Sequence, residues 1–487
     1  MPPWAFGNEF SRGTDPEPVD TYRIRSSRSD RPRRSPWRVA AASWWSTVFA
    51  RVGRTRWSSA FVPMWRSSGS ERPWCSGDIG YGWVMPEADA AKSAIIDDIG
   101  AMADRLVDVS RSIHARPELN FEEHFAHDLL CDVLEAAGLP VTRHAYGVAT
   151  AFEATAGTDG PEILVLLEYD ALPGIGHGCG HNIIAAAGLG AGLATAKLAT
   201  ALGGRVRILG TPAEEGGGGK IYMARNGAFS SGDAAMMVHP ADADLVRMHS
   251  IAIHTVDVEY SGRAAHAAAA PWEGRNALDA AVLGYMNVAA LRQHIRPTER
   301  VHGIITDGGE KPNVVPRRAA ANWYVRSDTI ESLQPLKRRV LDCLEGATSA
   351  CGCTMSAEWD DVAYADVRDN RAMVDSYVRN MTSIGREVVD PDVVGRRVMG
   401  STDMGNVSYL LPSIHPMVKA APDGTAIHTE DFARHAGSES GDAAVVAGAT
   451  AMAMTVVDLW SDPALLAGVK REFAGVTSSV DVLGVTR

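Results

Sequence analysis

The sequence predicts an α/β protein in which a mainly parallel sheet is interrupted by a smaller α+β domain. Between residues 94 and 240, short apolar runs alternate with helical patterns, as in sheets with helices on both faces. Around residue 252 the runs begin to alternate apolar with polar residues, which indicates half-exposed strands. From about residue 365 the helix and strand alternation resumes, so the second domain is expected to be an insert.

The first predicted elements are two helices, within residues 94–137, whose apolar residues recur at helical spacing. Gly138 and Pro140 end the second helix, as a C-cap glycine and a helix breaker. Strands are expected within residues 141–154, and residues 163–167 predict a fully buried strand because all five are apolar.

The remaining predicted elements belong to the sheet domain and to the insert. In the sheet domain they are a helix at 183–202, strands at 205–209 and 234–238, and a late Ala-rich helix at 441–460. In the insert they are a strand at 251–260, a helix at 277–291, strands near 301–307 and 319–326, a helix at 330–349 and a strand near 354–360. This β-α-β-β-α-β order is typical of a ferredoxin-like domain.

Residues 1–84 differ in composition from the rest of the chain. They hold 13 arginines, 7 acidic residues and 8 of the 12 tryptophans, but no lysine and no leucine. A core-forming domain without leucine is hard to build. We consider a disordered extension, a targeting segment, or an upstream reading that precedes a true start at Met85. The last is favoured because ordinary helical sequence follows Met85 at once and no clean signal-peptide layout is present.

The overall composition narrows the classes of partner. A net charge of −12 disfavours nucleic acid as the main partner. No run reaches the roughly 18 consecutive apolar residues of a membrane span, so no membrane association is expected. Six cysteines in 487 residues do not form a disulfide framework. We expect a cytoplasmic protein.

Side chains that bind metals follow the predicted strands. In open α/β sheets, functional groups gather at the carboxyl ends of the strands. The candidates are Glu168 and Asp170, Cys179 and His181 at the start of a helix, Glu214 and Glu215, His239, and His428 late in the chain.

Each candidate taken singly has an ordinary alternative: a buried thiol, a satisfied histidine, a solvated helix cap, a turn or a surface residue. Together, beside the glycines at 216–219, they indicate one site. A mixture of Cys, His and Glu suits zinc, manganese, cobalt or nickel better than calcium or magnesium. More ligands than the four of a closed structural zinc site fit a pair of ions that share a bridging ligand.

Three motifs in the chain resemble those of the aminoacylase/carboxypeptidase-type dinuclear metallopeptidases. The motifs are Glu-Tyr-Asp-Ala-Leu-Pro at 168–173, Gly-His-Gly-Cys-Gly-His-Asn at 176–182 and Gly-Ser-Thr-Asp-Met-Gly-Asn at 400–406. They are most similar to the aminoacylase-like dipeptidase subgroup. That subgroup belongs to the cysteine-containing branch with the indole-acetyl-amino-acid, p-aminobenzoyl-glutamate and hippurate hydrolases. The likeness covers residues 90–460.

The resemblance implies a set of metal ligands. Cys179, His181, Glu215, His239 and His428 would hold two divalent ions, zinc or manganese, with cobalt possible.

The resemblance also implies the residues that act beside the metals. Glu214 would be the general base, and Asp170 would occupy the invariant aspartate position beside the first metal. Most of the clan has a histidine two residues before that aspartate, where this chain has Glu168.

Three residues of the insert match family positions that contact substrate. His266 lies in the motif whose histidine donates to the developing oxyanion, often from the other subunit. Asn313 matches an asparagine that contacts substrate. Arg326 matches an arginine that is expected to bind a substrate carboxylate through two hydrogen bonds. Their ordinary alternatives are an exposed loop histidine for His266 and a surface salt bridge for Arg326.

The resemblance thus implies a zinc-peptidase-type catalytic domain (85–251 and 365–487) with a ferredoxin-like lid and dimerisation domain (252–364). The expected protein is a homodimer that hydrolyses the amide bond of a dipeptide or an N-acyl amino acid. An N-acyl-amino-acid amidohydrolase of the aminobenzoyl-glutamate or hippurate type and a non-catalytic metal-bound scaffold remain alternatives. Glu214 argues against the scaffold, because metal binding does not need it. A zinc nucleobase deaminase would need a Pro-Cys-x-x-Cys motif, which the sequence lacks.

Overall fold

The computed structural model describes residues 88–393, 399–475 and 478–484. The interpretations of residues 1–84 and of Met85 therefore concern residues outside the described part of the chain, and they stay predictions. The boundaries of the expected domains also stay predictions.

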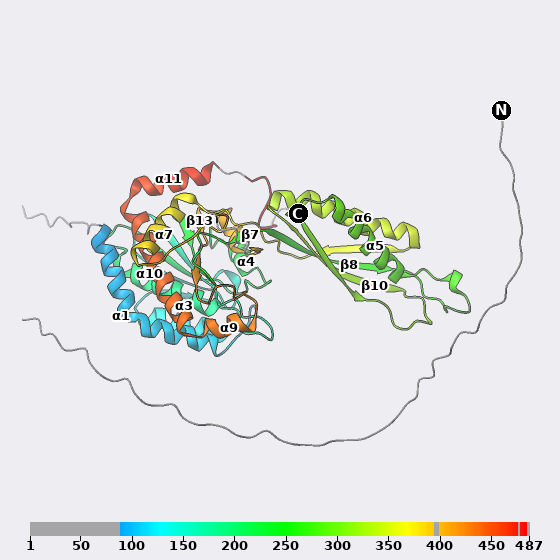
Figure 1. Ribbon diagram of the computed structural model, residues 1–487, viewed down its shortest axis with the longest axis horizontal. Coiled ribbons are helices and arrows are strands. Elements are labelled where there is room, and N and C mark those ends of the chain that lie inside the picture. Colours follow the sequence, from blue (N-terminus) through cyan, green and yellow to red (C-terminus); the bar gives the residue numbers. More distant parts are fainter. Residues whose placement is uncertain (1–87, 394–398, 476–477, 485–487) are drawn as a thin grey trace, which may run out of the picture. The chain divides into compact units, whose positions relative to one another are not determined.

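A six-stranded sheet lies at the centre of the first domain (Figure 1). Its strand order is β1-β2-β4-β3-β5-β13, in which β1–β2 and β2–β4 pair antiparallel and the other three pairs are parallel. The expectation of a mainly parallel sheet is confirmed. The strands are β1 (Val141–Arg143), β2 (Phe152–Ala156), β3 (Glu162–Leu167), β4 (Arg205–Gly210), β5 (Ala234–Met236) and β13 (Ser413–Ile414).

The central strand β3 is buried on both faces, as its apolar run predicts. Ile163, Val165 and Leu167 join the core formed with α1 (Ala88–His114), α3 (His181–Leu198) and α10 (Glu439–Ser461). The alternate residues Leu164 and Leu166 pack in a second core with residues of α4 (Gly219–Arg225) and α8 (Met404–Ser408). Helices therefore cover both faces of the sheet.

Glycines let α3 approach the sheet closely. A Cβ atom at Gly192 would lie 2.5 Å from Ile208 Cδ1, so no larger residue fits without displacement of the Ile208 side chain of β4. In the described part of the chain, α10 is the one helix long and apolar enough to cross a membrane by length and composition. In α10, 83% of that apolar window is buried inside the structure, which is also typical of a core helix.

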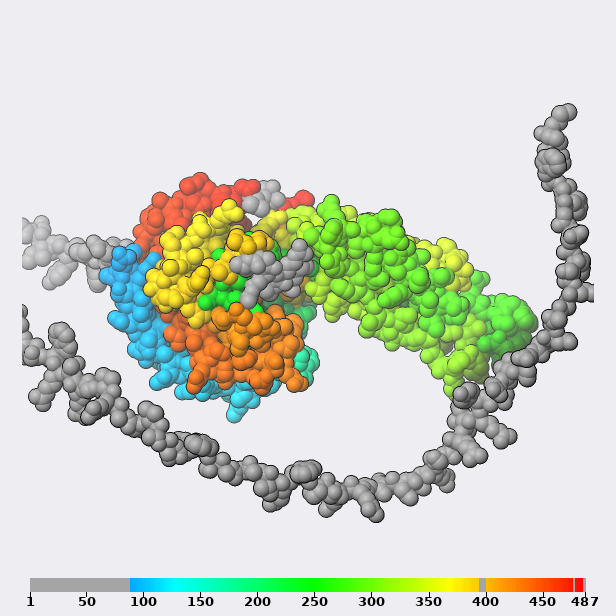
Figure 2. All heavy atoms as spheres, in the orientation of Figure 1, coloured from blue at the N-terminus to red at the C-terminus, as the bar shows by residue number. Residues whose placement is uncertain are grey.

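The other helices of this domain are α2 (His124–Ala136), the 3-10 turn η1 (Ala145–Gly147), α7 (Arg371–Ser383), α9 (Glu430–Ala436) and α11 (Pro463–Ala474). In the space-filling view, α7 (yellow) and the segment around α9 (orange) lie at the surface (Figure 2). Two small parallel pairs complete the domain: β6 (His239–Ala241) with β14 (Met417–Lys419), and β7 (His249–Ser250) with β12 (Met399–Gly400).

One boundary at the candidate site differs from the sequence-based expectation. We expected a strand over 234–238 with His239 at its end, whereas β5 ends at Met236 and His239 is the first residue of β6. The cause is the pairing of His239 with Met417 of β14, which no local pattern reveals.

The insert is a four-stranded antiparallel sheet with the order β11-β8-β10-β9, and two helices pack on it. The chain order β-α-β-β-α-β is the one that the sequence predicts, which confirms the ferredoxin-like lid. The elements are β8 (Ala252–Ser261), α5 (Ala277–Leu291), β9 (Arg300–Asp307), β10 (Arg318–Ser327), α6 (Ile330–Cys351) and β11 (Thr354–Trp359), with the 3-10 turns η2 (Pro271–Glu273) and η3 (Arg292–His294).

Candidate metal and catalytic site

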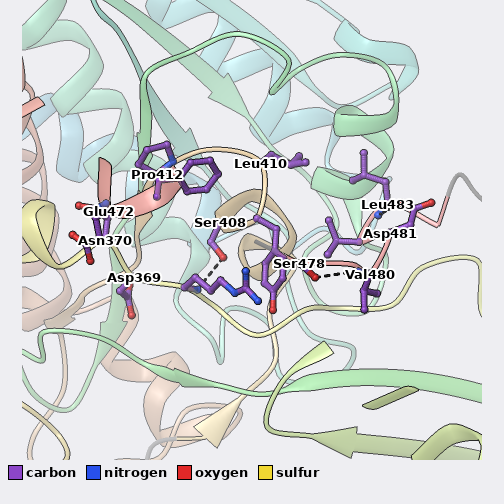
Figure 3. A pocket seen from close by; sticks show the side chains of 14 residues that line it. Asp369, Asn370, Ser408, Leu410, Pro412, Glu472, Ser478, Val480, Asp481 and Leu483 are labelled. Atoms are coloured by element: carbon purple, nitrogen blue, oxygen red, sulfur yellow. Dashed lines mark hydrogen bonds between the residues drawn. The ribbon is translucent and has the colours of Figure 1, made fainter. Parts of the chain in front are cut away.

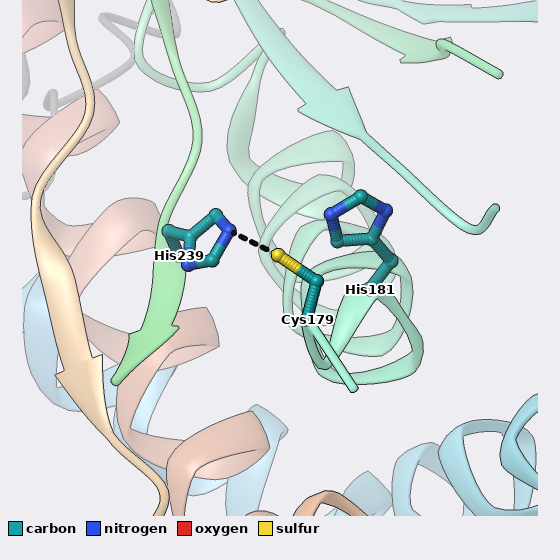
Figure 4. Close-up of side chains that lie close together, drawn as sticks. All are labelled: Cys179, His181 and His239. Atoms are coloured by element: carbon teal, nitrogen blue, oxygen red, sulfur yellow. Dashed lines mark hydrogen bonds between the residues drawn. The ribbon is translucent and has the colours of Figure 1, made fainter. Parts of the chain in front are cut away.

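A glycine brings the first two candidate ligands together. Gly180 has φ +77°, and a Cβ atom there would lie 2.6 Å from Pro240 Cγ. Only glycine satisfies both conditions, so the start of α3 can approach the His239-Pro240 dipeptide. As a result, Cys179 Sγ lies 3.3 Å from His239 Nε2, and both side chains are buried (Figure 4).

The five predicted ligands form two groups that share Cys179, and a third group joins His181 to Glu168 and Glu214. In one group Cys179 joins His181 and His239, and in the other it joins Glu215 and His428; within each group the ligand atoms all lie within 4.8 Å of one another. Cys179 could thus serve as a ligand in either group, and the two groups together would hold a pair of ions.

The donor set fits divalent metal ions. The buried atom His181 Nε2 has no hydrogen-bond partner in the described part of the chain, and it belongs to one of these groups. Unpaired buried polar atoms are costly, so they indicate a ligand. Thiolate, imidazole and carboxylate together suit zinc or a similar ion.

Asp170 orients two of the candidate ligands. Its Oδ1 lies 2.8 Å from His181 Nδ1, and its Oδ2 accepts a hydrogen bond from the backbone N–H of Glu215 at 2.8 Å. Burial opposes ionisation of Asp170, but His181 and the Glu215 N–H outweigh it and lower its pKa. The charged carboxylate directs the other nitrogen of His181, Nε2, toward the ligand group.

Glu214 lies beside the ligand groups on a constrained loop. Its Oε2 is 3.9 Å from His181 Nε2, and its backbone carbonyl accepts a hydrogen bond from Tyr364 Oη at 2.7 Å. The preceding residue, Ala213, has φ +59°, a strained conformation that the Glu123 carboxylate supports by accepting from its N–H at 2.9 Å. Burial, together with the charges of Glu168 and Glu215, raises the pKa of Glu214 well above its ordinary value.

His428 reaches the site from an exposed loop. Its backbone has φ +64°, and its N–H donates to the Gly178 carbonyl at 2.8 Å. Its Nε2 lies 3.2 Å from Glu215 Oε1, and its side chain is 52% exposed. His428 is therefore the solvent-facing member of the candidate set.

Sequence reasoning missed a buried ionic cluster centred on Lys220. The ammonium group of Lys220 pairs with Glu168 and, at 2.7 Å, with Asp403 Oδ1, and all three side chains are fully buried. The Lys220 backbone N–H also donates to Asp403 Oδ2 at 2.9 Å. A lone lysine after the glycines at 216–219 was the only available signal.

A cavity of about 640 Å³ adjoins the candidate ligands. Its walls include Arg326 of the insert, so the structure brings this predicted residue to the site. Its principal lining residues are Cys179, Glu214, Glu215, His239 and His428 from the first domain, and His254, Thr255, Tyr324, Arg326 and Asp360 from the insert.

The other two predicted insert residues lie near each other but not at this cavity. His266 pairs with Val314 in an isolated β-bridge, and the Ala267 N–H donates to the Asn313 carbonyl at 3.0 Å. Neither His266 nor Asn313 is among the described residues that line the cavity. Within one chain, the structure does not join them to the ligand groups.

A second cavity, of about 290 Å³, is separate from the site (Figure 3). The C-terminal segment 478–483 forms one wall, and residues 368–370 and 408–412 contribute others. That segment is held by its backbone: Val482 O accepts from Asn406 Nδ2, and Leu483 O from Arg225 Nε, each at 2.7 Å. None of the candidate site residues lines this cavity.

A sequence profile described as peptidase family M20/M25/M40 matches residues 164–455, well over half of the chain. The chain belongs to this family. This membership confirms the expected family and the expected class of enzyme, a hydrolase of the metallopeptidase type.

Individual relatives of this M20 peptidase agree with the assignment. An Xaa-Arg dipeptidase of Mus musculus is 42% identical over 402 residues, which are 80% of this chain and 93% of that protein. A chain of the p-aminobenzoyl-glutamate hydrolase of Escherichia coli is 30% identical over 457 residues, 79% of this chain and 95% of that one.

Solved structures confirm the fold of the M20 peptidase. A putative aminohydrolase from methicillin-resistant Staphylococcus aureus superposes with a TM-score of 0.63 at 19% identity, over 75% of this chain and 99% of that one. A dinuclear metal-binding peptidase of the M20 family from Bacillus subtilis superposes with a TM-score of 0.57 at 19% identity, over 74% of this chain and 99% of that one.

Proposed function

We propose that this M20 peptidase is a metal-dependent dipeptidase that releases an amino acid with a free carboxylate. The observation that carries the proposal is the single cavity lined by candidate metal ligands, by a buried glutamate and by an arginine. Dipeptides are favoured over N-acyl amino acids because the relative at 42% identity is a dipeptidase, whereas the aminobenzoyl-glutamate hydrolase is 30% identical.

Two divalent ions would be held by the groups that share Cys179. When bound there, they would polarise the amide carbonyl and lower the pKa of the attacking water. We propose zinc or manganese, with cobalt as a possible substitute. The five ligands are Cys179, His181, Glu215, His239 and His428.

Glu214 is proposed as the general base. It lines the cavity and is buried, and a carboxylate in this position can take a proton from water and then return it to the leaving amine. Asp170 keeps His181 and Glu215 in place, so it acts as a positioning residue.

Arg326 is proposed to bind the substrate carboxylate. Its guanidinium lies in the cavity wall, where Nη1 is 3.5 Å from Ser401 Oγ, and Nε is buried without a partner in the described residues. A planar guanidinium offers paired donors that match a carboxylate.

We also propose that the active form is a homodimer in which His266 and Asn313 serve the partner's site. Since neither lines the cavity of its own chain, a second chain must supply them if they contact substrate. β9 is an edge strand of the insert, and its Ile304 is 65% exposed, while Met286 of the adjacent α5 is 59% exposed. Exposed apolar side chains beside a free strand edge favour pairing of two copies.

We also propose a cytoplasmic location, which the free cysteines of the described residues support.

The test uses the full chain, stripped of metal and reloaded with zinc, manganese or cobalt. Each form is assayed on dipeptides, on hippurate and on p-aminobenzoyl-glutamate, with a chelator control. We expect chelator-sensitive cleavage, with dipeptides preferred. Preference for the N-acyl substrates would replace the dipeptidase assignment, and cleavage of no substrate by a folded, metal-loaded protein would reject it.

A further inference from the structure

The third group of candidate ligands lies beside the two that share Cys179. It consists of Glu168, His181 and Glu214, all three of them buried. His181 Nε2 is 3.6 Å from Glu168 Oε2 and 3.9 Å from Glu214 Oε2. Two ligands of one ion, each bound at about 2.1 Å, lie roughly 3.0–3.6 Å apart. A small movement of the side chains would therefore close this group around an ion.

Glu168 presents an unpaired oxygen to this group. Its Oε1 accepts a hydrogen bond from the ammonium group of Lys220, which fixes the carboxylate. Its Oε2 is buried and has no hydrogen-bond partner among the described residues. Leaving a buried carboxylate oxygen without a partner is costly, so Glu168 Oε2 is a sign of a cation ligand that the groups with Cys179 do not explain.

The buried charges of this region are also out of balance. Lys220 pairs with Glu168 and with Asp403, so one ammonium group serves two carboxylates. Glu214 adds a third acidic side chain, on which the charges of Glu168 and Asp403 act. Buried charges are stabilised by charged partners or by metal ions. A divalent ion between Glu168 and Glu214 would supply the missing positive charge.

His181 cannot serve two groups at once. The Nε2 atom of a neutral imidazole has a single lone pair, and the Nδ1 side of this ring is engaged by the carboxylate that orients it. An ion bound to Nε2 therefore has two mutually exclusive positions. One is completed by Cys179 and His239, and the other by Glu168 and Glu214.

The two positions differ in the kind of ion that they suit. The first offers a thiolate and a second imidazole, which are soft or borderline donors typical of zinc sites. The second offers two carboxylates and one imidazole, and carboxylate oxygens suit harder ions such as manganese. The choice between the positions should therefore depend on the metal.

We propose that Glu168, His181 and Glu214 form a second position for the His181-bound ion, which harder divalent ions occupy in place of the position that contains the thiolate. Glu168 then helps to set which metals the protein retains, although it is not a ligand of the zinc form. An ion held here occupies the Glu214 carboxylate, so this is a resting position and not the catalytic one. The inference rests on the metal-dependent function proposed above, and it adds a residue that determines the choice of metal.

The test measures equilibrium binding of Mn²⁺ and Zn²⁺ to the full-length protein after its metal has been removed. Glu168→Gln should weaken Mn²⁺ binding at least about tenfold, because a ligand is lost, and should change Zn²⁺ binding by less than about twofold. Cys179→Ser should show the reverse selectivity, with the larger loss for Zn²⁺. X-ray absorption gives a measurement on the wild type alone. The mean number of sulfur neighbours per ion should be lower in the manganese form than in the zinc form.

The matched control is Asp403→Asn, which removes the other partner of Lys220 but no ligand of the group. It should keep the wild-type affinity for Mn²⁺, and thermal unfolding of the metal-free proteins checks the folding of each variant. Three results would each overturn the inference: the same factor for both ions in Glu168→Gln, an equal loss of Mn²⁺ binding in Asp403→Asn, or equal numbers of sulfur neighbours in the two metal forms. In these cases the metal-dependent function would stand, whereas a wild type that binds neither ion would reject that function itself.

Discussion

Glu214 is the side chain on which the proposed chemistry depends most directly. It lines the cavity and belongs to neither ligand group that shares Cys179, although its carboxylate also lies within 4.8 Å of ligand atoms of Glu168 and His181. Its backbone carbonyl accepts a hydrogen bond from Tyr364 Oη, which anchors the main chain at this position whatever the charge of the side chain.

Glu214→Gln should retain the metal content of the wild type and lose turnover. The amide cannot accept a proton, so we expect kcat to fall by roughly 10²- to 10⁴-fold. Steady-state kinetics and elemental analysis of the same sample measure both quantities. Wild-type turnover in this variant would show that another group is the base.

Replacement of Lys220 should lower the stability of the protein strongly. Lys220→Met leaves the buried Glu168 and Asp403 without their common cation, so the free energy of unfolding should fall by about 3–5 kcal/mol. Lys197→Met is the control, since Lys197 is exposed in its pair with Asp98 and should cost at most about 1 kcal/mol. Urea denaturation of the metal-free proteins measures both, and equal effects would refute the buried-cation argument.

The ligand residues and the Lys220 cluster differ in how far sequence reasoning reaches. Cys179 and His181 lie two residues apart beside glycines, and the ends of the neighbouring strands can be predicted from local patterns. The candidate site could therefore be predicted from the sequence. Lys220 meets Glu168 and Asp403 across 52 and 183 residues of chain. A lysine is expected to be exposed to solvent, because lysines are rarely buried in proteins. Only the tertiary packing shows that Lys220 is buried.

At the scale of elements, local patterns were sufficient for the long elements. The strand β3 follows from a continuous apolar run, the helices α3 and α10 from stretches rich in Ala and other apolar residues, and the element order of the insert from alternating and helical patterns. The short strand β6 escaped prediction because three residues carry no periodicity, and its existence depends on pairing with β14.

Gly219, the first residue of α4, provides the prediction at this scale. In Gly219→Ala, the new Cβ would lie 1.8 Å from the Pro212 carbonyl oxygen, so the loop that carries Glu214 must move. We expect a lower melting temperature and lower kcat. The control is Gly100→Ala in the exposed part of α1, where no atom lies within 4 Å and helix propensity should add up to about 1 kcal/mol. An unchanged melting temperature for Gly219→Ala would contradict the close packing.

At the scale of the whole molecule, the proposal that each subunit supplies His266 to its partner's site can be tested by mixing two inactive variants. His266→Ala and Glu214→Gln should each be nearly inactive alone. In a two-fold symmetric dimer, each mixed pair regains one intact site, so a re-equilibrated equal mixture should recover about a quarter of wild-type activity. Activity no higher than that of the separate variants would mean that His266 acts within its own chain or not at all. Size-exclusion chromatography confirms that the mixed sample is dimeric.

The C-terminal segment beside the second cavity has a consequence for how this sequence can vary among relatives. Asn406 and Arg225 donate hydrogen bonds to the backbone carbonyl oxygens of Val482 and Leu483. A backbone carbonyl is present whatever the side chain. Substitutions at 482 and 483 therefore leave both hydrogen bonds available. An insertion or deletion just before residue 482 would instead move both carbonyl groups away from their donors at once. Over evolutionary time this tail should tolerate changes of residue type more readily than changes of length.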